Sequence, residues 1–190
     1  MGDLRGHSFA LCLTHDVDRP YKRLYQALYF SLRDRDSRHL REYLAGENPF
    51  WQFDALTSLE DDLGVRSAFY FLNEPSLLAS DPATLFDSTT LVEKLGRYDV
   101  TAPAVAEVIR SLDDGGWEVG LHGSYYTACD RDRLRTEKET LESVLGHSIT
   151  GGRQHHLRHA STETWRHYRA LGLRYDASPG STTDYGFDGE

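Results

Sequence analysis

The sequence predicts an α/β fold in which parallel strands form a sheet or a barrel. Segments with strand and helix patterns alternate at least four times, and the strand segments are continuously apolar, as expected of strands that are covered on both faces. A chain of 190 residues, of which 39% are hydrophobic, is long enough for one domain with a sizeable core and short for two. We therefore expect a single domain over residues 1–190.

The N-terminal segment predicts a strand followed by a helix. The apolar run Ser8–Thr14 is typical of a buried strand. Pro20 suits the first turn of a helix, and residues 21–32 have helical apolar spacing. Asp16 and Asp18 therefore lie on the loop from this strand to this helix.

A second helix and strand follow. Residues 53–63 predict a helix that ends at Gly64, and Ser67–Leu72 predicts a short buried strand. From residue 73 to residue 100 the pattern weakens, and long loops in compact domains are often functional, so we interpret this span as an insertion on the substrate side. In the predicted helix over residues 53–63, the apolar positions are Phe53, Leu56, Leu59 and Leu63.

The remaining elements repeat the helix and strand unit. A helix capped by Thr101, with Pro103 in its first turn, precedes a strand over 117–124. Asp130 opens the next helix and Gly146 closes it. The final segments are a strand-like connection over 148–158, a helix capped by Ser161 or Thr162, and a last strand over 173–178.

Composition excludes several classes of function. The net charge of -9 and the lack of a basic patch interleaved with aromatic residues disfavour binding to nucleic acid. No window approaches the roughly 18 apolar residues of a membrane span, and the N-terminus does not have the pattern of a signal peptide, so we expect a cytoplasmic protein without a membrane span. Cys12, which we expect in the core, and Cys129, in a polar loop, do not predict a disulfide.

The predicted strands end in residues that bind metals or transfer protons. In parallel α/β folds, chemistry gathers at the carboxyl ends of the strands. Residues two apart in an extended segment point to the same side, so Asp16 and Asp18 would repel each other unless a cation binds one of them. The residues after successive strands are Asp16 and Asp18, Asn73, His122, the group Arg153, His155 and His156, and Asp176.

Each of these residues also has an ordinary structural interpretation. Asp18 can cap a helix and His122 can bond a neighbouring carbonyl. In an extended segment only one side chain of the pair His155 and His156 faces inward. Taken together, however, one Asp and two His can surround a metal with a second Asp beside it, which is the arrangement of an open hydrolytic centre.

The motifs resemble those of the polysaccharide deacetylase family, the NodB homology domains of carbohydrate esterase family 4. "LTHDVD" resembles the first motif of the family, "LHGSYY" the second, and "GGRQHHLR" the third. The likeness runs from about Phe9 to the segment "YDASPGSTTDYGF" and covers most of the chain. It implies an irregular (β/α) barrel of seven or fewer strands, which we expect to be truncated at the C-terminus and open there.

The resemblance also implies roles for individual residues. Asp16 would be the general base, Arg153 would hold it in position, and Asp18 would bind a divalent metal ion, for which we expect zinc. The second histidine of the second motif is replaced by Tyr126. Beside Asp18, we therefore expect the metal ligands His122 and His155, with His156 as the weaker alternative to His155.

The function implied by this resemblance is hydrolysis of an N-acetyl group on a sugar or polysaccharide. Two alternatives stay open: hydrolysis of another non-peptide C–N bond, and an inactive carbohydrate-binding barrel, which the missing histidine makes plausible. Aromatic residues near the motifs, such as Tyr125 and Tyr126, can stack on sugars, but aromatic side chains fill cores routinely, and we do not count them as site residues.

Overall fold

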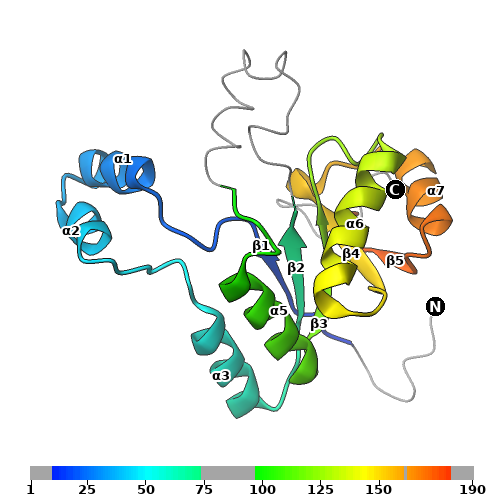
Figure 1. Ribbon diagram of the computed structural model, residues 1–190, viewed down its shortest axis with the longest axis horizontal. Helices are drawn as coiled ribbons and strands as arrows, with labels where there is room; N and C mark the ends of the chain where they lie inside the picture. The colour runs from blue at the N-terminus through cyan, green and yellow to red at the C-terminus, as the bar shows by residue number, and fades with distance from the viewer. Residues whose placement is uncertain (1–9, 74–96, 161, 181–190) are drawn as a thin grey trace.

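Five parallel strands form one sheet in sequential order, which confirms the predicted α/β fold (Figure 1). The computed structural model describes residues 10–73, 97–160 and 162–180. Across these ranges β1 and β5 are not paired with each other, so the sheet is open where a closed barrel would join its edges. The strands are β1 (Thr14–Val17), β2 (Ala68–Leu72), β3 (Glu118–Gly123), β4 (Gly151–Gln154) and β5 (Tyr175–Asp176).

Helices connect the strands. Figure 1 shows α3, α5, α6 and α7 arranged around the strands, while α1 and α2 project to one side. No helix in the described ranges is long and apolar enough to cross a membrane. The helices are α1 (Leu24–Asp34), α2 (Arg38–Leu44), α3 (Phe53–Leu63), α5 (Pro103–Asp114), α6 (Arg131–Leu145) and α7 (Thr162–Ala170).

The core lies between the sheet and the helices that cover it. Phe53 at the start of α3 packs against Phe69 and Phe71 of β2, with ring centroids 6.2 and 6.1 Å away. The buried cluster extends through α5, α6 and α7 by way of residues such as Ile109, Leu134 and Tyr168. Because each helix buries one apolar face against the sheet, the polar ends of the strands are held in place by a packed layer.

Two glycines in the sheet, Gly120 and Gly151, leave room for the rings of neighbouring tyrosines. A Cβ atom at Gly120 would lie 2.8 Å from the ring of Tyr70, and one at Gly151 would collide with the ring of Tyr175. The hydroxyls of these tyrosines lie 3.2 Å apart, and Tyr175 donates to Glu118 over 2.6 Å. The absence of a side chain at Gly151 therefore lets the ring of Tyr175 pack directly against the backbone of β4.

The first strand differs from the prediction. β1 covers Thr14–Val17, whereas a strand was predicted over Ser8–Thr14, of which residues 8 and 9 lie outside the described residues. Leu11 is 74% exposed and Cys12 is exposed instead of buried in the core. The reason is the pairing: β1 pairs with β2, whose first residue is opposite Thr14, so earlier residues have no neighbouring strand.

Several helix predictions hold and others need correction. α3 has the predicted bounds, but Leu59 and Leu63 are 55% and 66% exposed, because only part of the predicted face reaches the sheet. Asp130 caps α6 through the backbone N–H of Arg133. Thr101 does not cap α5; it bonds to the carboxylate of Asp99. The predicted insertion over 73–100 lies mostly outside the described residues, and α2 was not predicted.

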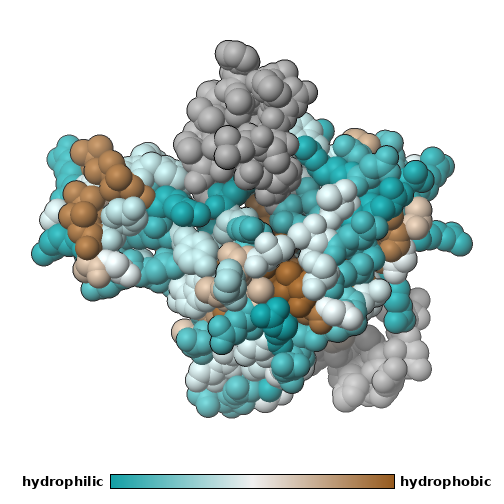
Figure 2. Space-filling view, viewed as in Figure 1, coloured by the Kyte–Doolittle hydropathy of each residue, from teal (hydrophilic) through white to brown (hydrophobic). Residues whose placement is uncertain are grey.

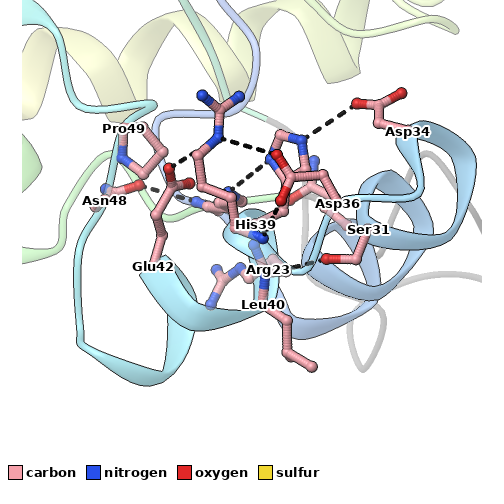
Figure 3. Close-up of polar contacts among 12 residues, drawn as sticks. Arg23, Ser31, Asp34, Asp36, His39, Leu40, Glu42, Asn48 and Pro49 are labelled. Carbon is pink, nitrogen blue, oxygen red and sulfur yellow. Dashed lines mark hydrogen bonds and ion pairs between the residues drawn. The ribbon is translucent and has the colours of Figure 1, made fainter.

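A buried lysine holds the projecting pair of helices together. The ammonium of Lys22, just before α1, is 2.7 Å from Glu42 and 3.3 Å from Nδ1 of His39, both on α2. Its backbone N–H donates to Asn48, and Figure 3 shows the surrounding contacts. Hydrophobic residues gather on the outer surface of these helices (Figure 2), namely Leu24, Leu28, Tyr29, Leu32 and Leu44.

Candidate metal centre

Three side chains converge at the carboxyl ends of the strands. Asp18 follows β1, His122 lies in β3, and His155 begins the short 3-10 helix η3 (His155–Leu157) directly after β4. Nε2 of His122 lies 3.1 Å from Oδ1 of Asp18 and 3.1 Å from Nδ1 of His155. Nδ1 of His155 is 3.4 Å from the same carboxylate oxygen. Their donor atoms thus form a compact triangle in which all lie within 4.8 Å of one another.

The dimensions of this triangle fit a metal ion. In a tetrahedral site with bonds of about 2.0–2.1 Å, two ligand atoms lie about 3.3 Å apart. The three donor atoms here are separated by 3.1 to 3.4 Å. Although Oδ1 of Asp18 is this close to two imidazoles, it is buried and has no hydrogen bond of ordinary geometry. An oxygen that points between donors in this way is arranged to bind a cation.

A backbone carbonyl orients His122. The residue is only 2% exposed, and its Nδ1 lies 3.0 Å from the carbonyl oxygen of Arg153. A carbonyl only accepts, so we infer that the proton of the neutral ring lies on Nδ1 and that Nε2 keeps its lone pair toward Asp18. The contact follows from the sheet register, because His122 and Arg153 are paired between β3 and β4.

The two histidines keep Asp18 ionised. Burial by itself raises the pKa of this carboxyl group, but the two imidazoles beside it, His122 first and then His155, outweigh burial and lower the pKa well below its usual range. The group is therefore a carboxylate throughout the physiological pH range. A carboxylate and two imidazoles together are donors of the kind that hold divalent metal ions in proteins.

Asp16 is paired with Arg153 and not with the histidines. Nη1 of Arg153 lies 3.0 Å from Oδ1 of Asp16, while its Nε donates to the carbonyl of Ala177 over 3.0 Å. The guanidinium also lies over the ring of Tyr70, 5.2 Å from the centroid. From β4, Arg153 thus contacts β1, β2 and the residue directly after β5, and Asp16 is held in one orientation two residues before Asp18.

The structure brings the five predicted site residues to one edge of the sheet but leaves the alternative ligand outside the triangle. His156 adopts a left-handed conformation (φ 56°) and is exposed. Its ring lies 4.0 Å from that of His155 and 6.3 Å from that of Tyr125. Tyr126, which occupies the place of the missing histidine, is 37% exposed and packs edge-on against Tyr125.

Other polar residues at the strand ends contact the protein itself. Asn73, after β2, donates to the carbonyl of Glu137 over 3.1 Å. Asp176, in β5, accepts hydrogen bonds from the backbone and hydroxyl of Ser178. Neither belongs to the triangle of donor atoms.

A buried tyrosine that sequence reasoning missed ties β1 to β2. The hydroxyl of Tyr98 donates to the carbonyl of Val17 over 2.6 Å and accepts from the N–H of Leu72 over 3.1 Å. Val17 directly precedes Asp18, so this bridge fixes the backbone next to the residue that carries the carboxylate. No local signal marks Tyr98, because its partners lie 81 and 26 residues away in the chain.

A buried carboxyl group secures the end of β3. Glu137 of α6 accepts from the backbone N–H of Ser124 over 3.0 Å and also from its hydroxyl. Burial raises the pKa of Glu137 to about 7, although the bonds to Ser124 oppose this shift. Since Ser124 lies two residues after His122, the contact holds the turn that follows this candidate ligand.

Fold and site together define an α/β protein with a candidate metal centre at the carboxyl edge of a parallel sheet. A crystal structure described as a "putative polysaccharide deacetylase from Mycobacterium smegmatis" has a similar fold, with a TM-score of 0.51 and 20% sequence identity. The match covers 87% of this chain and 49% of that one, so the chain spans about half the length of the protein it resembles. The predicted resemblance is thereby confirmed at the level of the fold.

Comparison of sequences adds no further assignment. No family model matches the chain, and no curated protein matches it either. The likeness to the mycobacterial protein is therefore a likeness of fold, and the chemistry of the site rests on the residues of this chain.

Proposed function

We propose that the protein is a metal-dependent hydrolase that removes an N-acetyl group from a sugar or polysaccharide. The observation that carries this proposal is the convergence of Asp18, His122 and His155 beside the pair Asp16 and Arg153. A metal site and a separate, oriented carboxylate are the two groups needed to activate a water molecule for attack on a carbonyl carbon. The fold shared with a described deacetylase supports an N-acetylated carbohydrate as substrate.

Asp18, His122 and His155 would hold the ion, and the mixed oxygen and nitrogen donors favour zinc. When bound, a divalent ion supplies Lewis acidity, which polarises the substrate carbonyl and lowers the pKa of water. His122 contributes a lone pair whose direction is set by the carbonyl of Arg153. The burial of this histidine excludes competing water from one side of the site.

Asp16 would act as the general base. It is ion-paired to Arg153 and its side chain is 32% exposed, so one carboxylate oxygen is fixed by the guanidinium while water reaches the group from solvent. The ion pair with Arg153 orients the carboxylate that would accept the proton. Because Asp16 is outside the triangle, the base and the metal ligand are separate carboxylates.

Metal content tests the proposal. We expect elemental mass spectrometry to find close to one zinc or similar divalent ion per purified chain, and to find it lost in His122→Ala. His147→Ala is the matched control, because His147 is half exposed and contacts Asp113 on α5. The absence of metal in the wild-type protein, even after dialysis against zinc, would refute the metal centre.

A substrate panel separates this function from its two rivals. Release of acetate from N-acetylated sugars, with none of the cyclic ureides hydrolysed, is the expected result. Turnover of the ureides instead would identify another C–N hydrolase. Sugar binding that is independent of metal and never accompanied by turnover would identify an inactive carbohydrate-binding protein.

A further inference from the structure

Two exposed tyrosines lie next to the candidate metal centre. Tyr125 and Tyr126, on the loop after β3, are 36% and 37% exposed and pack edge-on with ring centroids 5.2 Å apart. A series of ring contacts joins them to the metal-binding triangle: Tyr125 is 6.3 Å from His156, which is 4.0 Å from His155. These tyrosines are therefore not core residues, and a substrate positioned at the centre lies within reach of them.

Each tyrosine is paired with an arginine. The guanidinium of Arg158 lies 4.0 Å from the ring centroid of Tyr125 and donates to the carbonyl of the same residue over 2.8 Å. The guanidinium of Arg133, on α6, lies 5.3 Å from the ring centroid of Tyr126. Stacking on an aromatic ring leaves the edge of a guanidinium able to bind a carboxylate or phosphate through two parallel hydrogen bonds.

The loop that carries the tyrosines is anchored below its surface. Thr127 is fully buried, and its hydroxyl lies 2.7 Å from both the carbonyl of Ser124 and the side chain of Gln154. Its backbone N–H also donates to Ser124. Because these contacts hold both ends of the turn, little conformational entropy would be lost when a ligand settles on the two rings.

The positive charge of this surface contrasts with the protein as a whole. The chain has a net charge of -9, yet Arg133 and Arg158 both face the tyrosine pair. Two guanidinium groups beside flat rings suit a ligand that combines a sugar ring with an anionic group.

We propose that Tyr125, Tyr126, Arg133 and Arg158 form a subsite for an acidic sugar, one that bears a carboxylate or a phosphate, and that this subsite positions the N-acetylated substrate at the metal centre. The rings take the apolar face of the pyranose, and the guanidinium groups bind the anion. The inference rests on the proposed function for its second part, while the preference for acidic sugars can be measured without any turnover.

Binding to the metal-free 190-residue chain tests the preference. Three probes differ in charge: N-acetylglucosamine, N-acetylglucosamine 6-phosphate and N-acetylmuramic acid, which carries a carboxylate. By calorimetry or saturation-transfer NMR we expect at least one acidic probe to bind about tenfold more tightly than the neutral one, the effect of one charge-assisted hydrogen bond. The better of the two acidic probes identifies the anionic group.

Variants attribute the preference to the subsite. Arg158→Gln should reduce binding of the acidic probe to the level of the neutral sugar, and Arg133→Gln should weaken it independently if the first variant fails to fold. Arg131→Gln is the matched control, since Arg131 is an exposed arginine at the start of the same helix, α6. Tyr125→Leu should weaken binding of all three probes.

Two results would overturn the subsite: equal binding of the neutral and acidic probes, or a preference that survives both arginine variants. Failure of the proposed function looks different. A protein that prefers acidic sugars but neither binds metal nor releases acetate would support the subsite and refute the proposed hydrolase function. A metal-bound, active enzyme without the preference would support the hydrolase function and refute the subsite.

Discussion

Two aspartates separated by one residue have different surroundings, which fit the different roles that we propose for them. Asp18 lies against His122 and His155, whereas Asp16 is paired with Arg153. Two carboxylates so close in sequence would repel each other if both faced the same space. The structure removes this conflict by giving one of them imidazole partners and the other a guanidinium partner.

The role of Asp16 can be tested by removing its charge alone. Asp16→Asn should reduce kcat at least about 100-fold, because the amide cannot accept a proton from water, while zinc content stays unchanged. Steady-state kinetics together with elemental analysis measure both effects. Asp54→Asn, at an exposed position on α3, should match the wild type. Retained activity in Asp16→Asn would exclude this residue as the base.

The adjacent histidines provide a second test at the residue scale. His155→Ala removes one corner of the triangle and should weaken zinc binding by about 100-fold. Loss of a residue that only supports a metal ligand weakens metal affinity by up to about 100-fold, and loss of a ligand should weaken it at least as much. His156→Ala should change it much less, since its ring is outside the group. Competition with a chromogenic chelator measures both affinities, and the opposite order would assign the third ligand to His156.

At the scale of the elements, contacts between strand ends hold the centre together. Tyr98 bridges β1 and β2, and Glu137 fixes the turn after β3. The fully buried Gln154, at the end of β4, contacts Thr127 and Tyr168. Each strand that leads to a candidate ligand is thus held by a side-chain contact within two residues of that ligand. Small displacements of the strand ends would move the three donor atoms apart.

Removal of one hydroxyl tests this support. Tyr98→Phe leaves the carbonyl of Val17 and the N–H of Leu72 buried without their partner, which should lower the free energy of unfolding by about 1–3 kcal/mol. Zinc affinity should fall as well, because the end of β1 is released. Urea unfolding measures the first effect, with the exposed Tyr29→Phe as a control expected to stay within about 0.5 kcal/mol. Unchanged stability would show that the bridge is dispensable.

At the scale of the whole molecule, the sheet is open between β1 and β5 across the described residues, and the chain matches about half of the mycobacterial protein. Stability is therefore carried by one layered core and by a few buried polar groups such as Glu137 and Lys22. Among these groups, Glu137 links stability to pH. Its pKa is raised from 4.5 to about 7 on folding.

The sign of this pH dependence follows from proton binding. Between the two pKa values the folded protein binds the proton of Glu137 and the unfolded chain has lost it, so the free energy of unfolding falls as pH rises, by roughly 3 kcal/mol in total. Glu137→Gln should lack this component. Urea unfolding at about pH 5 and about pH 8 measures it, with the exposed Glu139→Gln as control. If the free energy of unfolding changed equally with pH in the wild type and in Glu137→Gln, the raised pKa could not be assigned to Glu137.

Much of the fold could be predicted because its signals are local. The bounds of α3, the cap at Asp130 and the turn at Gly146 follow from apolar spacing and capping chemistry within a few residues. The predicted β1 was displaced because a strand exists only where it has a neighbour, and the neighbour begins opposite Thr14. The exposure of Leu59 likewise depends on where α3 meets the sheet.

The residues of the candidate site could be named in advance because side chains at the carboxyl ends of parallel strands share one edge. Residue types and their positions after apolar runs gave a list that also held Asn73, His156 and Asp176, and the resemblance to the family motifs chose Asp16, Asp18, His122, Arg153 and His155 from it. The choice between His155 and His156, and the supports from Tyr98 and Glu137, depend on contacts between segments far apart in the chain. Chain packing alone sets such distances, so the folded structure, and not the local pattern, separates Asp16 from the candidate metal centre and brings the arginine-paired tyrosines beside it.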